Sequence, residues 1–249
     1  MSPPLYTNRG GFFMFGVKAL FFILLAGCSA SYSPENGGLA ELNLHSPVHD
    51  QLSTGMGYSV SSAVKIISVK GDMSGHGSGN YFKLRGERFI MTAAHNVTET
   101  TAVFVEERNG NTVGAKVVFM EQSQDVAILK LDNDLVATKP VPYKINAVPN
   151  IIGKTLYYTS NPSQIEYILT KAFVSKSEPD QLMLQANAWY GSSGAVVFDK
   201  QGRVCGTVTG ILVGHGPIVP QGLENYVFVS RVSFLTKDRI QEILGGGRD

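Results

Sequence analysis

Short apolar runs separated by Gly, Pro, Asn, Asp and Ser recur along most of this chain. About twelve of them are rich in Val, Ile, Phe and Tyr, which is typical of strands bounded by turns. They are Val64–Val69, Tyr81–Leu84, Phe89–Thr92, Ala102–Glu106, Lys116–Met120, Val126–Leu131, Thr155–Thr159, Tyr167–Val174, Leu182–Gln185, Ala195–Phe198, Val204–Val213 and Tyr226–Val229. This pattern predicts an all-β fold with two six-stranded antiparallel β-barrels.

A convincing helical repeat occurs at one place, near the C-terminal end. Apolar residues recur there at helical spacing before Gly245 to Gly247 end the pattern. These residues are Phe234, Leu235, Ile240, Ile243 and Leu244. We therefore expect a short C-terminal helix beside the two barrels. No internal repeat of about 20 to 50 residues is visible, which excludes propellers and solenoids.

Length and charge limit the class of protein further. The chain has 249 residues and a net charge of +1, with basic and acidic residues well mixed. Nucleic-acid binding requires a basic face that neutralises phosphates, so we expect no nucleic-acid partner. The chain has two cysteines, Cys28 and Cys205, which predicts no disulfide framework. Cys205 lies inside an apolar run and is expected to be a buried, inert thiol.

The N-terminal segment has the features of an export signal. Arg9 and Lys18 accompany an apolar stretch whose uninterrupted part, Ala19 to Ala26, is too short to span a membrane as a helix. The stretch ends in Leu25-Ala26-Gly27-Cys28, which resembles the lipobox of bacterial lipoproteins and implies lipid attachment at Cys28. The alternatives are an ordinary signal peptide in which Cys28 is incidental, or an uncleaved anchor.

The chain then divides into a predicted tether and a predicted domain. Residues 29–58 are rich in Ser, Pro, Gly and Asn, which is typical of a flexible linker. We therefore expect a signal peptide at 1–28, a tether at 29–58 and a folded domain at 59–245.

Three local motifs carry candidate chemistry. His95 follows the apolar run Phe89–Thr92, and Asp125 directly precedes the run Val126–Leu131. A carboxylate can accept the imidazole Nδ1–H and stabilise the imidazolium that forms when histidine takes up a proton. Ser193 lies in Gly191-Ser192-Ser193-Gly194, where glycines give access to unusual backbone angles. Each motif alone is also compatible with an ordinary histidine, a solvated aspartate or a plain turn.

Together, in the order His, Asp, Ser on an all-β background, the motifs indicate a catalytic triad. The chain resembles the chymotrypsin-like (trypsin-fold) serine peptidases through Thr92-Ala93-Ala94-His95, Asp125-Val126-Ala127-Ile128-Leu129 and Gly191-Ser192-Ser193-Gly194. Gly77-Ser78-Gly79 is similar to a motif of the compact bacterial branch, HtrA-type and glutamyl-endopeptidase-like. The resemblance identifies 59–245 as a trypsin-like peptidase domain, and we expect no PDZ domain in this chain.

The resemblance also implies roles for individual residues. Ser193 is the nucleophile, His95 the general base and Asp125 its orienter, while the Gly191 and Ser193 amides form the oxyanion hole. Asn187 falls toward the base of the substrate pocket, Trp189 and Tyr190 line its approach, and the strand segment Gly206 to Gly210 with Thr209 forms a wall. Asn187 has no full charge, so we expect an uncharged preference before the scissile bond.

The sequence departs from the family in two places. Ser192 stands where trypsin-type zymogens carry an aspartate, which makes activation by a new N-terminus unexpected. Gly194 is followed by Ala195-Val196 rather than by the usual Gly-Pro or Ser-Pro, a change expected to alter packing more than chemistry.

The expected function is therefore a serine endopeptidase that takes polypeptide substrates and forms an acyl-enzyme. The alternatives are a catalytically silent trypsin-fold lipoprotein that binds a peptide or partner, and a structural envelope lipoprotein. We expect no cofactor and no metal, since Pro47 separates His45 from His49. His76 and His215 are expected in solvated loops. The expected location is the bacterial cell envelope, with the membrane reached only through the lipid anchor; the oligomeric state is left open.

Overall fold

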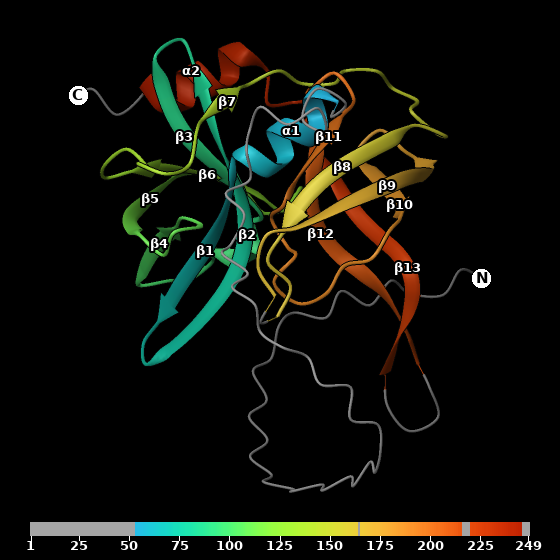
Figure 1. Cartoon of the computed structure of the whole chain (residues 1–249), viewed down its shortest axis with the longest axis horizontal. Coiled ribbons are helices and arrows are strands. Elements are labelled where there is room, and N and C mark those ends of the chain that lie inside the picture. Colours follow the sequence, from blue (N-terminus) through green and yellow to red (C-terminus); the bar gives the residue numbers. More distant parts are fainter. Residues whose placement is uncertain (1–52, 164, 216–219, 246–249) are drawn as a thin grey trace, which may run out of the picture. The chain divides into compact units, whose positions relative to one another are not determined.

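The computed structural model describes residues 53–163, 165–215 and 220–245. The predicted signal peptide, Cys28 and nearly all of the predicted tether lie outside the described residues. Strands dominate, and Figure 1 shows them as two groups, one formed by the first half of the domain and one by the second.

The first barrel contains six antiparallel strands. Its strands are β1 (Ala63–Lys70), β2 (Met73–Leu84), β3 (Glu87–Thr92), β4 (Ala102–Glu106), β5 (Thr112–Glu121) and β6 (Val126–Leu131). They pair in the order β1-β4-β5-β6-β3-β2, and the pairing of β2 with β1 closes the barrel. A two-residue strand, β7 (Val141–Pro142), adds to β2 in parallel.

The second barrel is closed in the order β10-β13-β12-β11-β8-β9. Its strands are β8 (Thr155–Ser160), β9 (Ile168–Ser177), β10 (Gln181–Gln185), β11 (Val196–Asp199), β12 (Val204–His215) and β13 (Pro220–Arg231). Helix α2 (Lys237–Gly245) follows. It begins after Thr236, whose hydroxyl accepts from the Arg239 amide at 3.2 Å, so Phe234 and Leu235 precede the helix. The predicted fold, two six-stranded barrels with a short C-terminal helix, is confirmed.

Alternating burial along the strands builds the core. In β10, Leu182 and Leu184 are fully buried while Gln181 and Gln185 face solvent, because successive side chains of a strand point to opposite faces. One hydrophobic cluster contains residues of both barrels and of α2. Within it the rings of Phe82 and Phe198 lie 5.9 Å apart and join the first barrel to the second.

The sequence did not predict helix α1 (Thr54–Ser61). The sequence gives only a weak helical signal there, because two of the eight residues are glycine. The helix is nevertheless capped, since the Ser53 hydroxyl accepts from the Met56 amide at 3.3 Å. A Cβ on Gly55 would lie 1.7 Å from the Asp199 carbonyl oxygen, so glycine is what allows the helix to pack closely against β11. The helix spans the predicted boundary between tether and domain.

Strand β2 is also longer than predicted, because its first half is rich in glycine and was read as a loop. It pairs with β1 from Ala63 opposite Asn80 to Lys70 opposite Met73. This extension places Ser78 and His76 in a strand of the first barrel, and Ser78 hydrogen-bonds from there to Gly191 and Ser193.

Candidate functional site

His95 and Asp125 form a hydrogen-bonded pair at one end of the first barrel. His95 lies in the single-turn helix η2 (Ala94–Asn96) after β3, and Asp125 ends the turn before β6. The imidazole Nδ1 lies 2.7 Å from Asp125 Oδ2, and Asp125 Oδ1 accepts from the His95 amide at 2.9 Å. The carboxylate thus holds both the ring and the backbone of His95, and it favours the tautomer with the proton on Nδ1.

The histidine of this pair remains accessible. Its side chain is 47% exposed, whereas that of Asp125 is 24% exposed. Asp125 also has a φ of +47°, a left-handed conformation that aspartate tolerates better than most residues. This backbone turn directs a mostly covered carboxylate toward an imidazole that is itself accessible to a ligand.

Ser193 lies in a loop that glycine makes sterically feasible. Gly191 and Gly194 have φ angles of +94° and +86°. A Cβ on Gly194 would lie 2.2 Å from the Ser78 carbonyl oxygen and 2.3 Å from Thr92 Oγ1. The missing side chain therefore lets the segment Gly191 to Gly194 of the second barrel, which we call the serine loop, approach β2 and β3 of the first barrel.

The backbone of Ser193 is fixed by the first barrel. Its carbonyl accepts from the Ser78 amide at 2.8 Å and from Asn96 Nδ2 at 2.9 Å. Asn96 directly follows His95 and also donates to Thr92 Oγ1 at 3.0 Å. One asparagine thus connects the histidine turn to the serine loop.

A family comparison agrees with this arrangement. The model of the trypsin-like peptidase domain matches residues 77–206, more than half of the chain, from β2 into β12. The chain belongs to the trypsin-like peptidase family. The matched segment includes His95, Asp125 and Ser193.

Curated relatives and solved structures agree with this family. Protease Do-like 1, chloroplastic, of Arabidopsis thaliana is 27% identical over 56% of this chain and 34% of its own length. Serine protease Do-like HtrA of Lactobacillus helveticus is 28% identical over 51% and 33%. The chain spans about a third of the length of these relatives.

The fold is similar to that of solved serine peptidases. The serine endoprotease from Yersinia pestis matches with a TM-score of 0.60 and 22% identity, covering 78% of this chain and 66% of that structure. The Rv3671c protease of M. tuberculosis, in its active form, matches with a TM-score of 0.62 and 22% identity, covering 78% and 85%. At these identities the likeness concerns the fold.

The substrate-binding residues predicted from the family lie around the serine loop. Trp189 and Tyr190 are 52% and 74% exposed, and their rings meet edge to face with centroids 5.5 Å apart.

Asn187 is exposed, and its backbone carbonyl accepts from the Tyr158 hydroxyl at 2.6 Å. Thr209 is half-buried and donates to the Phe228 carbonyl at 3.4 Å. Burial raises the pKa of Tyr158 to about 12, so this hydroxyl stays protonated and can donate to Asn187 well above neutral pH.

Ser192 occupies the position of the zymogen aspartate as a buried, neutral residue. Its hydroxyl accepts from the Trp189 amide at 3.2 Å and lies 3.3 Å from the hydroxyl of Ser160. These partners satisfy a hydroxyl but offer no cation that would neutralise a carboxylate.

Three residues outside the triad motifs were also predicted from the sequence: His76 and His215 in solvated loops, and Cys205 as a buried thiol. His76 lies in β2 rather than in a solvated loop, and its Nε2 is buried without a hydrogen-bond partner among the described residues. A Cβ on Gly191 would lie 2.5 Å from that nitrogen, so the ring packs against the serine loop. His215 likewise ends a strand, β12. Cys205 is buried as predicted, and burial raises the pKa of its thiol to about 12.

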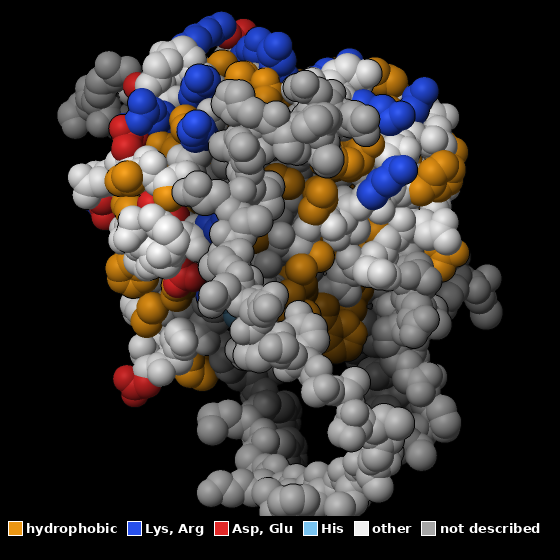
Figure 2. Space-filling view, viewed as in Figure 1, with side chains coloured by type: hydrophobic (Ala, Val, Ile, Leu, Met, Phe, Trp, Pro, Cys, Tyr) orange, Lys and Arg blue, Asp and Glu red, His pale blue; other side chains and the backbone are white. Residues whose placement is uncertain are grey.

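A basic hollow lies away from the residues named above. Figure 2 shows Lys and Arg side chains gathered at the end of the molecule that carries α2 and β7. Lys83, Lys144 and Lys237 contribute to a hollow of about 390 Å³ there, together with Arg85 and Arg88. The two arginines are paired with Asp238 and Asp134. None of the candidate site residues lines this hollow.

No helix within the described ranges is long and apolar enough to cross a bilayer.

Proposed function

We propose that this protein is a serine endopeptidase that uses Ser193, His95 and Asp125 as a catalytic triad. Ser193 Oγ attacks the carbonyl carbon of a peptide bond as His95 Nε2 takes its proton, and Asp125 stabilises the imidazolium. The C–N bond then breaks, His95 returns the proton to the leaving amine, and an acyl-enzyme remains. Water, activated by the same histidine, releases the acid and regenerates Ser193.

The connection between the two motifs is the observation that carries the proposal. Asn96 follows His95 in the chain and donates to the Ser193 carbonyl at 2.9 Å. Asn96 therefore links the backbone of the proposed nucleophile to the turn that carries the proposed general base. Gly191 has a φ of +94°, a backbone conformation that glycine adopts readily, and this supports a role for the Gly191 and Ser193 amides as donors to the oxyanion.

A serine-directed fluorophosphonate tests the assignment. We expect wild type to be labelled at Ser193, and Ser193→Ala to lose both labelling and peptide hydrolysis while it remains folded. Ser192→Ala is the matched control, because it removes the neighbouring hydroxyl and leaves Ser193 in place. A folded wild type that is never labelled would instead indicate a peptide-binding module without turnover.

The proposed substrate is a polypeptide with an uncharged residue before the cleaved bond. Asn187 brings no full charge to the serine loop, and the aromatic pair of Trp189 and Tyr190 offers an exposed apolar surface beside it. A peptide-library cleavage profile dominated by Lys, Arg or Glu at that position would contradict this specificity.

We also propose export and lipid anchoring through Cys28, which would place the enzyme at a bacterial cell envelope. The support is Leu25-Ala26-Gly27-Cys28 after a short apolar stretch. Several acyl chains at about 0.8 kcal/mol per CH₂ hold a protein on a bilayer, whereas one chain does not. Wild type expressed with its own signal should partition into detergent, and Cys28→Ser should gain no lipid. Equal partitioning of the two would indicate an uncleaved anchor.

A further inference from the structure

The two peptide groups on either side of Gly191 are both held by hydrogen bonds. The Tyr190 carbonyl accepts from the Ser163 amide at 2.7 Å. The Gly191 carbonyl accepts from the hydroxyl of Ser78, also at 2.7 Å. One donor comes from the loop between β8 and β9 and the other from β2 of the first barrel.

These bonds determine where the Gly191 amide points. A trans peptide group is planar, and its N–H is directed opposite to its carbonyl. Holding the Tyr190 carbonyl on Ser163 therefore turns the Gly191 N–H away from that loop. Holding the Gly191 carbonyl fixes the next peptide plane, at a residue with a φ of +94° that would otherwise rotate freely because glycine has no Cβ.

Ser78 contacts the serine loop with more than its hydroxyl. Its amide donates to the Ser193 carbonyl at 2.8 Å, and its own carbonyl accepts from the Thr92 hydroxyl at 2.7 Å. The residue is fully buried. Ser78 thus contacts both Gly191 and Ser193, the two residues whose amides form the oxyanion hole of the proposed function.

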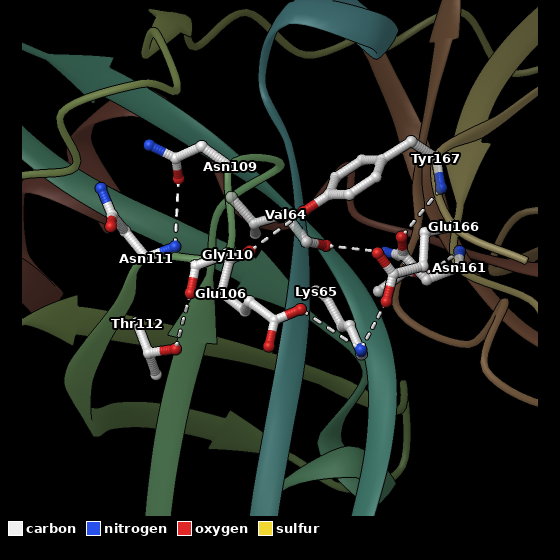
Figure 3. Close-up of polar contacts among 11 residues, drawn as sticks. Val64, Lys65, Glu106, Asn109, Gly110, Asn111, Thr112, Asn161, Glu166 and Tyr167 are labelled. Carbon is white, nitrogen blue, oxygen red and sulfur yellow. Dashed lines mark hydrogen bonds and ion pairs between the residues drawn. The ribbon is translucent and has the colours of Figure 1, made fainter. Parts of the chain in front are cut away.

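Asn161 orients the Ser78 hydroxyl. Its backbone amide donates to Ser78 Oγ at 2.9 Å, so the hydroxyl has its own proton free for the Gly191 carbonyl. The Asn161 side chain is itself held on both ends. Its Nδ2 donates to the Val64 carbonyl at 3.1 Å and its Oδ1 accepts from the Tyr167 amide at 3.0 Å (Figure 3).

The loop that carries Asn161 is fastened to the first barrel at its other end. The Tyr167 hydroxyl donates to the Glu106 carbonyl at 3.2 Å, and the Arg108 guanidinium lies 4.5 Å from the centre of the Tyr167 ring. Lys65 binds Glu166 at 2.6 Å and Glu106 at 3.2 Å, as Figure 3 shows. The loop that holds Ser78 and the Tyr190 carbonyl is therefore itself attached to β1 through Lys65 and to β4 through Glu106.

We propose that Ser78, oriented by Asn161, is a positioning residue for the oxyanion hole. This inference rests on the proposed function and deepens it. Without the hydroxyl, the Gly191 carbonyl loses its donor and the Asn161 amide loses its acceptor. The Gly191 segment then rotates more freely, and its amide spends less time aligned with the developing oxyanion.

The matched control is Ser62, which has the same chemistry at a different place. Ser62 is fully buried, donates to the Tyr58 carbonyl at 2.7 Å and accepts from Asn80 Nδ2 at 2.9 Å. Ser62→Ala and Ser78→Ala each delete a buried hydroxyl that donates to a backbone carbonyl. The two variants should lose similar stability, so a difference in catalysis reports on position.

The experiment measures kcat, KM and the affinity of a peptidyl boronic acid with a valine side chain at the boron-bearing position. The boronate adds to Ser193 Oγ as a tetrahedral anion that uses the oxyanion hole. For Ser78→Ala we expect kcat to fall about 30- to 100-fold with KM within about twofold. Boronate affinity should fall by about the same factor as kcat, whereas Ser62→Ala should leave both unchanged.

Each result of these measurements either supports or overturns the proposed role of Ser78. A Ser78→Ala protein with wild-type kcat, or with lower kcat but unchanged boronate affinity, overturns the proposal. If Ser78→Ala does not fold, Ser78→Cys keeps the volume with a weaker donor and should give losses between those of Ala and wild type; unchanged kcat there overturns the proposal equally. Failure of the triad itself is distinguished because wild type would then be inactive and unlabelled by fluorophosphonate.

Discussion

The histidine half and the serine half of the site are built in opposite ways. His95 depends on one partner, Asp125, and nearly half of its side chain is open to solvent. The serine loop is held by a buried set of hydrogen bonds from Ser78 and Asn96 that crosses between the barrels. A general base must reach its substrate and needs only its orientation fixed, whereas an oxyanion hole requires backbone amides fixed in direction.

This difference predicts which substitutions affect chemistry and which affect folding. Changes at the exposed pair should lower the rate and leave stability almost unchanged. Changes at the buried loop should lower both, because the same contacts hold the barrels together.

Asp125→Asn should have a large effect on rate and a small effect on stability. The amide can donate where the carboxylate accepts, so it favours the wrong imidazole tautomer and no longer stabilises the imidazolium. We expect kcat to fall by about 10³- to 10⁴-fold, measured with the best peptide from a library, and the urea midpoint to change little. A variant with more than a tenth of wild-type kcat would remove Asp125 from the triad.

Gly194→Ala should have the largest effect on stability. Its Cβ would collide with the Ser78 carbonyl at 2.2 Å, in addition to the strain of a φ of +86°. We expect a loss of about 3 kcal/mol or more in unfolding free energy, together with loss of activity.

Gly110→Ala separates the two causes in Gly194→Ala. Gly110 has a φ of +84° but no atom within 4 Å of the added Cβ, so its cost should be the strain alone, about 1 kcal/mol. Urea denaturation compares the two variants directly. Equal losses would mean that the close approach of the barrels at Gly194 contributes nothing.

The same contrast explains what the sequence could and could not predict. The strands and the three motifs are local patterns, so His95, Asp125 and Ser193 could be singled out from short segments. Ser78 appeared only as part of a familiar Gly-Ser-Gly motif, because its partner Gly191 lies 113 residues away. Long-range pairing of this kind leaves no periodic signal.

Asn161 and Asn96 could not have been predicted for a related reason. Asn161 follows β8 in a segment that reads as an ordinary turn, and its contacts with the first barrel are with Ser78 and Val64, 83 and 97 positions away. Asn96 stands next to His95, but only the fold brings it to Ser193. The sequence predicts a strand at Tyr81–Leu84 but a loop for the glycine-rich first half of β2, because propensity disfavours glycine in strands; in the structure β1 supplies pairing partners for that half.

The smallest expected effect concerns alkaline pH at the contact that carries Tyr167. The pKa of Lys65 is raised chiefly by its hydrogen bond to Glu166, and burial raises the pKa of Tyr167. A group whose pKa is raised in the folded state contributes its full stability at any pH below its pKa in the unfolded chain, and this stability is lost as the pH rises further. For Lys65 and Tyr167 the pKa in the unfolded chain is near 10. The unfolding free energy should therefore decline above about pH 10.

Tyr167→Phe tests this contribution, because it removes the ionisable hydroxyl and keeps the ring beside Arg108. At pH 8 we expect it to cost about 1 kcal/mol, the worth of one hydrogen bond to Glu106. Between pH 10 and 11 its stability should fall less steeply than that of wild type, since one group that favours the unfolded state in alkali is gone. Urea midpoints at four pH values would give the two slopes, with Lys65→Met as a second variant of the same contact. Parallel slopes for wild type and both variants would mean that the interbarrel contact does not respond to alkali, and that the decline arises from buried tyrosines elsewhere, such as Tyr158.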